Sequence, residues 1–249
     1  MINNNIYFPL IISCSVQPQV QVALDDSKER LIQYKKSIKD WSESKSFSKI
    51  VLVENTGNHI LSNAELSNYK NKGVEIEQIV YGPEKNVSER GASWGSARIY
   101  ENAIKKSYFV RESDYFATTT GRTFVPNVNS LLKEFDKNHN KTYVNRWLHK
   151  GYKRFNPGRA DLRFVIWNKN FFITKISPCT EKLNDSKNIW IEHVYDEVFD
   201  SNRENIQSFS SLPRVVGQAG HQGGYYDGTR YHVWLAKNYL GKLTKSMFY

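Results

Sequence analysis

The chain has 249 residues, a length that suits one large α/β domain. Hydrophobic residues make up 39% of it and aromatic residues 14%, so the sequence can bury a core and is not that of a disordered protein. The formal net charge of +10 favours an anionic partner, such as nucleotide phosphates, nucleic acid or an acidic membrane surface. The two cysteines, Cys14 and Cys179, match no metal-ligand spacing, and no apolar stretch has the length of a transmembrane helix.

The first half of the sequence alternates between strand and helix patterns. Apolar or β-branched runs predict four strands, at Ile6–Ser13, Ile50–Val53, Val74–Tyr81 and Phe116–Thr120. Amphipathic spacing predicts three helices, one after the capping residues Asp25-Asp26-Ser27, one through Leu66 and Tyr69 to Gly73, and one over Ser96–Lys106. The first run lacks the basic start of a signal peptide, so we interpret it as a strand. This alternation predicts a single α/β domain with a mostly parallel sheet flanked by helices.

In such a sheet, ligands bind beyond the carboxyl ends of the strands. The predicted strands end at Ser13-Cys14-Ser15, at Glu54-Asn55 and at Thr120-Gly121-Arg122. Because these ends meet at one edge, the sequence predicts a single crevice lined by them. A metal-dependent enzyme is expected to place carboxylates there, but the stretch DYFATTTGRTFVPN places Arg122 at the end of its strand.

The second half of the sequence is less regular. Lys141–Trp147 and Leu162–Trp167 are predicted strands, and Ile189–Phe199 is a predicted helix with one apolar face. We interpret GQAGHQGG, Gly217–Gly224, as a mobile glycine-rich loop and Tyr231–Tyr249 as a basic amphipathic helix. No repeat or linker marks a domain boundary.

Glycines also precede the helix predicted over Ser96–Lys106, at Gly91 and Gly95, and Arg98 lies in its first turns. A helix start of this kind exposes backbone N–H groups that favour an anion. The spacing fits neither a P-loop nor a dinucleotide-binding fingerprint, so this piece taken alone favours an ordinary loop before a helix.

The order of these motifs is similar to that of small bacterial glycosyltransferases of O-antigen and capsule gene clusters, which adopt a GT-A-like (Rossmann-type) fold. The matching stretches are Arg30-Leu31-x-x-Tyr34, Glu54-Asn55-Thr56-Gly57, Gly91-x-x-x-Gly95 and Thr120-Gly121-Arg122. The resemblance covers roughly the first half of the chain, and its order and spacing matter more than any single motif. This sequence has Ala117-Thr118-Thr119 where a lysine commonly precedes Thr-Gly-Arg in the family.

The resemblance implies that a nucleotide-diphosphate sugar binds across the strand ends. The implied donor-binding residues are Ser13, Ser15, Arg30, Glu54, Asn55, Gly91, Gly95, Arg98, Thr120, Gly121, Arg122 and His221. Glycosyl transfer leaves negative charge on the diphosphate, which a metal or cationic side chains must stabilise. The sequence contains no Asp-x-Asp pair, and Asp114 stands alone before its strand. We therefore expect a metal-independent reaction without cofactors, in which the fixed charge of Arg122 replaces the metal; the alternative role of Arg122 is a surface salt bridge.

An inverting transfer also needs a base that takes the proton of the acceptor hydroxyl. Glu192 and Asp196 are four residues apart on one face of the predicted helix NIWIEHVYDEVF, and like charges at that spacing can raise a carboxyl pKa. Glu192 is the first candidate for the base and Asp161 the second, while Arg163 and Asp196 are candidates for contacts with acceptor or phosphate. A solvated acidic helix face is the alternative interpretation.

Two further elements have functional interpretations. The loop around His221 would fold over the bound donor and exclude water, with His221 donating to the diphosphate. The C-terminal helix would rest on the inner face of the inner membrane, near a lipid-linked acceptor, although packing on the protein itself is the safer expectation.

These observations predict a cytoplasmic glycosyltransferase that serves bacterial O-antigen, lipopolysaccharide or capsule synthesis, with residues 1–125 binding the donor and residues 126–249 the acceptor. The alternative is a nucleic-acid-binding protein that uses aromatic side chains and the basic loop His149–Arg159, but no recognised motif supports nucleic acid as a partner. A sugar nucleotidyltransferase is disfavoured because Ser15-Val16-Gln17-Pro18 replaces the glycine-rich stretch after the first strand. The sequence does not determine the sugar, the acceptor or the stereochemistry.

Overall fold

A computed structural model describes residues 8–136, 140–147, 159–219, 224–226 and 232. Its strands are β1 (Leu10–Cys14), β2 (Lys49–Glu54), β3 (Glu75–Val80), β4 (Tyr115–Thr120), β5 (Thr123–Phe124), β6 (Thr142–Trp147), β7 (Arg159–Asn168), β8 (Ile206–Gln207), β9 (Val216–Gln218) and β10 (Tyr225–Tyr226). Its α-helices are α1 (Ser27–Glu43), α2 (Asn63–Asn71), α3 (Lys85–Arg90), α4 (Ala92–Lys106), α5 (Tyr108–Arg111), α6 (Val128–Phe135), α7 (Lys169–Phe171) and α8 (Ile191–Ser201). Short π and 3₁₀ turns cover Phe172–Ile176, Ser177–Lys182, Asp185–Lys187 and Arg203–Asn205.

The central sheet has seven strands in the order β3-β2-β1-β4-β7-β6-β8. Strands β1 to β4 run parallel, and β7 runs antiparallel to both β4 and β6. A second sheet, β10-β9-β5, has three short strands. The predicted mostly parallel α/β fold is therefore confirmed.

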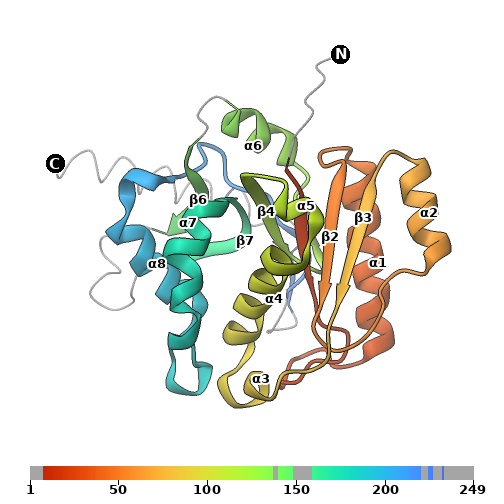
Figure 1. Ribbon diagram of the computed structural model, residues 1–249, viewed down its shortest axis with the longest axis horizontal. Coiled ribbons are helices and arrows are strands. Elements are labelled where there is room, and N and C mark those ends of the chain that lie inside the picture. Colours follow the sequence, from red (N-terminus) through yellow and green to blue (C-terminus); the bar gives the residue numbers. More distant parts are fainter. Residues whose placement is uncertain (1–7, 137–139, 148–158, 220–223, 227–231, 233–249) are drawn as a thin grey trace.

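Helices cover both faces of the central sheet (Figure 1). On one face α1 packs through Tyr34, Ile38 and Trp41, and α6 adds a second apolar helix. On the other face α4 and α8 pack against residues such as Val51 and Trp167. Strands buried on both faces explain why the parallel part of the sequence shows continuous apolar runs.

Local sequence sets the helix ends. The Asp26 carboxylate accepts a hydrogen bond from the Glu29 N–H at 2.8 Å and so caps α1, as the sequence predicted. Gly73 has a φ of +83° just after α2, a left-handed conformation that favours glycine. Within the described ranges, no helix combines the length and the apolar character that crossing a membrane requires.

Two predicted boundaries are wrong. Helix α4 begins at Ala92 rather than Ser96, so Gly95 lies inside the helix and packs on Val87 instead of forming an exposed loop. Gly217 and Gln218, predicted as part of a mobile loop, belong to β9 and pair with β5 and β10. A three-residue strand pattern is too short to detect from periodicity.

Candidate active site

The carboxyl ends of β1, β2 and β4 meet at one edge of the sheet, as the sequence predicted. Because β7 is antiparallel to β4, its beginning lies at the same edge and brings Asp161 there. The first residues of α4 and α8 also meet, since the Ile191 N–H donates to the Ser93 hydroxyl at 3.2 Å. This edge therefore gathers most of the predicted site residues.

Glu54 holds the loops that follow β1 and β2. Its side chain is almost fully buried, and its carboxylate accepts hydrogen bonds from the N–H groups of Val16 at 2.9 Å, Thr56 at 2.9 Å and Asn58 at 2.8 Å. The Thr56 hydroxyl also donates to Glu54. A carboxylate with this many backbone donors is satisfied inside the protein, so Glu54 shapes the crevice. Its predicted contact with donor remains a prediction.

Arg30 and Tyr34 hold the same segment from the side of α1. The Arg30 guanidinium donates to the carbonyl oxygens of Ser15 at 2.8 Å and Leu24 at 2.9 Å. The Tyr34 hydroxyl donates to the Ser15 carbonyl at 3.1 Å and accepts from the Ser15 N–H at 2.9 Å. The Arg-Leu-x-x-Tyr motif therefore fixes the backbone after β1.

Gly121 is required by a close approach between β4 and β1. A Cβ atom at this position would lie 1.9 Å from the Ser13 carbonyl oxygen and 2.5 Å from the Tyr34 ring. Thr120 stays on the strand and its hydroxyl contacts that of Thr123 at 2.8 Å. The Thr-Gly-Arg motif thus requires glycine at its second position because a larger side chain would not fit there.

We expect Gly121→Ala to lower the free energy of unfolding by about 1–3 kcal/mol, because the new methyl group would collide with the Ser13 carbonyl oxygen. Chemical denaturation measures this loss. Gly82→Ala is the matched control, since a Cβ there meets nothing within 4 Å. Equal stability of the two variants would contradict the close approach.

Arg122 lies at the end of β4 but is 6% exposed. Its Nη1 donates to the Gln33 amide oxygen at 3.0 Å and its Nη2 to the Ala219 carbonyl oxygen at 2.9 Å. Burial lowers the pKa of its guanidinium, which nevertheless stays charged. The alternative role in a surface salt bridge does not fit this position, because the side chain is buried.

The start of α4 already holds an anion from the protein itself. The Asp185 carboxylate accepts from the Ser93 N–H at 3.1 Å, and a Cβ at Gly91 would lie 2.4 Å from the same carboxylate oxygen. In this structure a carboxylate of the protein itself therefore lies at the start of α4, and donor binding at Gly91 stays a prediction. Sequence reasoning missed Asp185 because it lies far away along the chain.

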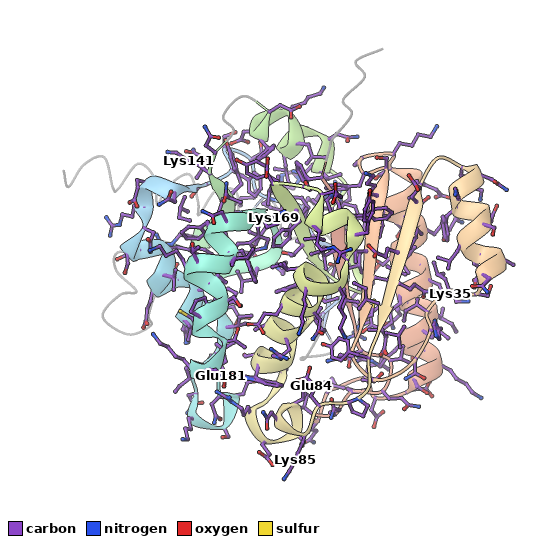
Figure 2. All side chains as sticks on the ribbon, viewed as in Figure 1. Lys35, Glu84, Lys85, Lys141, Lys169 and Glu181 are labelled. Carbon is purple, nitrogen blue, oxygen red and sulfur yellow. The ribbon has the colours of Figure 1, made fainter. Side chains whose placement is uncertain are left out.

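Arg98 is also engaged within the protein. It forms ion pairs with Glu84 at 3.3 Å and with Glu101, and its guanidinium lies 5.5 Å from the centre of the Trp94 ring. Arg90 stacks on the same ring and pairs with Glu181, and Figure 2 shows Glu84 and Glu181 at the end of the molecule where α3 lies. These contacts give Arg98 a packing role.

One predicted donor-binding residue presents an unused polar atom. Asn55 is 6% exposed, and its Oδ1 has no hydrogen-bond partner among the described residues. Buried polar atoms are usually paired, so an unpaired acceptor at the end of a strand points to a ligand. The segment between β1 and α1, which the Gln17 N–H joins to the Thr56 hydroxyl at 3.1 Å, forms an open pocket of about 340 Å³, lined by Gln17, Pro18, Val20, Gln21, Val22, Asp25 and Ser27.

The candidate carboxylates have different surroundings. Asp161 is bound through both oxygens by Arg163, at 2.8 and 2.6 Å. Asp196 forms a buried ion pair with Arg146 at 2.6 Å, so the expected coupling between Asp196 and Glu192 is replaced by this pair. Both carboxylates are thus already engaged by an arginine of the same chain.

Glu192 is half-buried in the first turn of α8 and lies near Tyr100. Burial raises the pKa of Tyr100 to about 12, hydrogen bonds with Thr118 and Ser13 oppose this rise, and the charge of Glu192 adds to it. The charge of Glu192 therefore acts on a hydroxyl that also bonds Ser13 of β1 and Thr118 of β4. Sequence analysis did not identify Tyr100 as a site residue.

Asn145 is a second missed candidate. It lies opposite Asp161 in the β6–β7 ladder, is buried, and its Nδ2 has no partner among the described residues. A polar residue inside the strand TYVNRW was the available signal. His221, the C-terminal helix and most of the basic loop lie outside the described residues. In the part of the chain that the structure describes, no three His, Cys, Asp or Glu residues form a metal-binding group.

Comparisons with known proteins place the fold. No model of a protein family matches the sequence, and no curated protein matches it. The glycosyltransferase GlyE of Streptococcus pneumoniae TIGR4 aligns over 82% of this chain with a TM-score of 0.50 and 11% identity. The galactosyltransferase LgtC, solved in complex with donor and acceptor sugar analogs, aligns over 81% with a TM-score of 0.50 and 12% identity. The chain has a GT-A-like fold.

The GT-A-like fold confirms the predicted architecture. The alignments cover 45% of the GlyE chain and 73% of the LgtC chain, so this chain spans about half the length of GlyE. At such low identities the similarity concerns the fold alone. The roles of individual residues at the carboxyl edge of the sheet are therefore inferred from the geometry of this chain alone.

Proposed function

We propose that this protein is a glycosyltransferase that moves a sugar from a nucleotide-diphosphate sugar to a glycan or lipid-linked acceptor. The observation that supports this most strongly is the buried Asn55 Oδ1, which lacks a partner among the described residues at the ligand-binding edge of a GT-A-like sheet. A nucleoside offers N–H and O–H groups that would satisfy this acceptor. The open pocket of about 340 Å³ after β1 adds space for such a group.

The proposed acceptor belongs to bacterial surface polysaccharide synthesis, as O-antigen, lipopolysaccharide or capsule. Its support is the order of the four motifs in the first half of the sequence. Two of these motifs hold the backbone after β1 in place, because Glu54 accepts a hydrogen bond from the Val16 N–H and Arg30 donates one to the Ser15 carbonyl oxygen. We do not favour the nucleic-acid alternative, because a GT-A-like fold offers it no support. The predicted membrane contact of the C-terminal helix stays a prediction.

We propose further that transfer is metal-independent. The sequence has no Asp-x-Asp pair, and β4 ends in Thr-Gly-Arg. Arg122 and Arg30 bring two permanent positive charges to the carboxyl edge, where a buried cation stabilises a leaving diphosphate more strongly than in water. The N–H groups of the strand-end loops would complete this stabilisation.

For an inverting transfer, Glu192 is the proposed base. The acceptor oxygen forms the bond to the anomeric carbon, the bond to the diphosphate breaks, and the acceptor proton passes to the Glu192 carboxylate. Two observations rank Glu192 above Asp161. Arg163 already binds both oxygens of Asp161, and the charge of Glu192 acts on Tyr100, whose hydroxyl bonds Ser13 of β1 and Thr118 of β4.

Asn55→Leu tests the donor site. We expect nucleotide affinity to fall about tenfold or more, because a hydrogen-bond acceptor for the ligand is lost. The stability of the unbound protein should change by less than about 1 kcal/mol, because Oδ1 has no partner among the described residues to lose. Thermal shifts with a panel of nucleoside diphosphates and their sugars, with and without divalent metal, measure both effects.

Asn58→Ala is the control, since the Asn58 amide donates to Thr56 at 3.2 and 3.0 Å within the same turn. It should lose stability but retain affinity. If none of the nucleotide sugars stabilises the unaltered protein, the donor-site proposal is wrong.

A further inference from the structure

The β9–β10 hairpin pairs with β5, just after the end of β4, and contacts two arginines, Arg122 and Arg163. Its strands pair through Gln218 with Tyr225 and through Gly217 with Tyr226, and β5 extends the sheet on the other side of β9. The Ala219 N–H donates to the Gly224 carbonyl at 2.7 Å. This short sheet depends on the contacts at its two ends.

Arg122 holds one end of the hairpin by three contacts. Its carbonyl oxygen accepts from the Gln218 N–H at 3.1 Å, and its Nη2 donates to the Ala219 carbonyl at 2.9 Å. Gly217 has a φ of +114°, and a Cβ there would lie 2.3 Å from the Arg122 carbonyl oxygen. Gln33 of α1 accepts from the other guanidinium nitrogen at 3.0 Å, so the side chain bridges α1 and the hairpin.

Tyr226 carries the other end of the hairpin onto β7. The Arg163 guanidinium lies 5.0 Å from the centre of the Tyr226 ring, close enough for a cation–π contact. The same guanidinium binds both oxygens of Asp161, which is 7% exposed. In addition, the Thr119 hydroxyl donates to the Arg163 carbonyl at 3.2 Å, so the pair is fixed from β4 as well.

We propose that Arg122 is a positioning residue: through the hairpin it presses Tyr226 on Arg163 and so fixes the Arg163–Asp161 pair at the site. This inference rests on the proposed glycosyltransferase function and deepens it. It gives Arg122 an effect on transfer that needs no contact with the donor. A small displacement of Arg163 and Asp161 is sufficient to lower turnover, because misplacement by about 1 Å can cost a hundredfold in rate.

The test combines hydrogen exchange with kinetics. Arg122→Gln removes the guanidinium group and leaves the backbone hydrogen bonds of residue 122 in place. Gln33→Ala removes the hydrogen bond between Gln33 of α1 and Arg122. In the protein without ligand, we expect both variants to speed exchange of the Gln218 and Ala219 amides, with that of the β1 and β2 amides unchanged. Exchange at Gln218 and Ala219 that stays unchanged in Arg122→Gln would overturn the proposal, whatever the activity.

Turnover then tests the coupling to Tyr226. Arg122→Gln and Tyr226→Ala should each lower kcat about tenfold or more with little change in KM for the donor, and the double variant should be no slower than the slower single one. Tyr226→Phe keeps the ring but removes the hydroxyl that also hydrogen-bonds Arg163, so its turnover should lie between those of Tyr226→Ala and the unaltered enzyme. Multiplicative losses in the double variant would contradict the inference, as would a donor KM that rises in Arg122→Gln alone.

Failure of the proposed function can be distinguished from failure of this inference. If the unaltered protein turns over no nucleotide sugar, the glycosyltransferase proposal falls, while the exchange measurements still decide whether Arg122 holds the hairpin.

Discussion

Replacement of Asp196 by asparagine is expected to lower the free energy of unfolding by up to about 3–5 kcal/mol, because the buried Arg146 loses the nearer and more buried of its two carboxylates and keeps only that of Asp200. The Arg146 and Asp196 side chains are 7% and 9% exposed, and Arg146 Nε lies 2.6 Å from Asp196 Oδ1. Arg146 also donates to the Asp196 carbonyl oxygen at 3.3 Å, a contact that the substitution retains. Chemical denaturation followed by circular dichroism measures the loss.

Asp200→Asn is the matched control. Asp200 contacts the same arginine at 3.2 Å and Arg203 at 2.8 Å, but its side chain is 40% exposed. Solvent screens such contacts, so a loss below about 1 kcal/mol is expected. Equal losses in both variants would mean that the buried pair has no special role in joining β6 to α8.

Replacement of Glu192 by glutamine is expected to lower kcat by about 10²–10⁴-fold, because the acceptor hydroxyl then loses its proton acceptor. The substitution preserves size and the first turn of α8, so the donor KM and the fold should change little. Steady-state kinetics with saturating donor measure the effect.

Glu197→Gln provides the control, since Glu197 is exposed on the same helix. It should leave kcat unchanged. A Glu192→Gln enzyme with full turnover would remove Glu192 from the mechanism, and a loss in Asp161→Asn alone would transfer the role of base to Asp161.

The sequence predicted the parallel half of the fold because its strands are buried on both faces. Ile50–Val53 and Phe116–Thr120 lie within β2 and β4, and Asp26 caps α1 as predicted. The second half was harder for a physical reason. Strands β5, β8, β9 and β10 have two or three residues, which is too few for a period of two to appear. The reversed direction of β7 likewise has no local signal.

The sequence predicted which strand ends meet at one edge of the sheet better than it predicted the contacts of the residues there. Glu54 and Arg30 lie at that edge, but their charges are satisfied by backbone groups of the same chain. Sequence alone cannot distinguish a carboxylate that binds a ligand from one that binds nearby N–H groups. Asp185 shows the same limit, because its contact with Ser93 joins positions that are 92 residues apart.

The central claim is glycosyl transfer from a nucleotide-diphosphate sugar without a metal. The most direct test is release of nucleoside diphosphate from a panel of nucleotide sugars, with surface-glycan or lipid-linked acceptors, in the presence and absence of a chelator. We predict acceptor-dependent release from at least one donor at a rate that the chelator leaves unchanged. Release that requires an added divalent metal would contradict the metal-independent mechanism, and no release from any donor would contradict the proposed function itself.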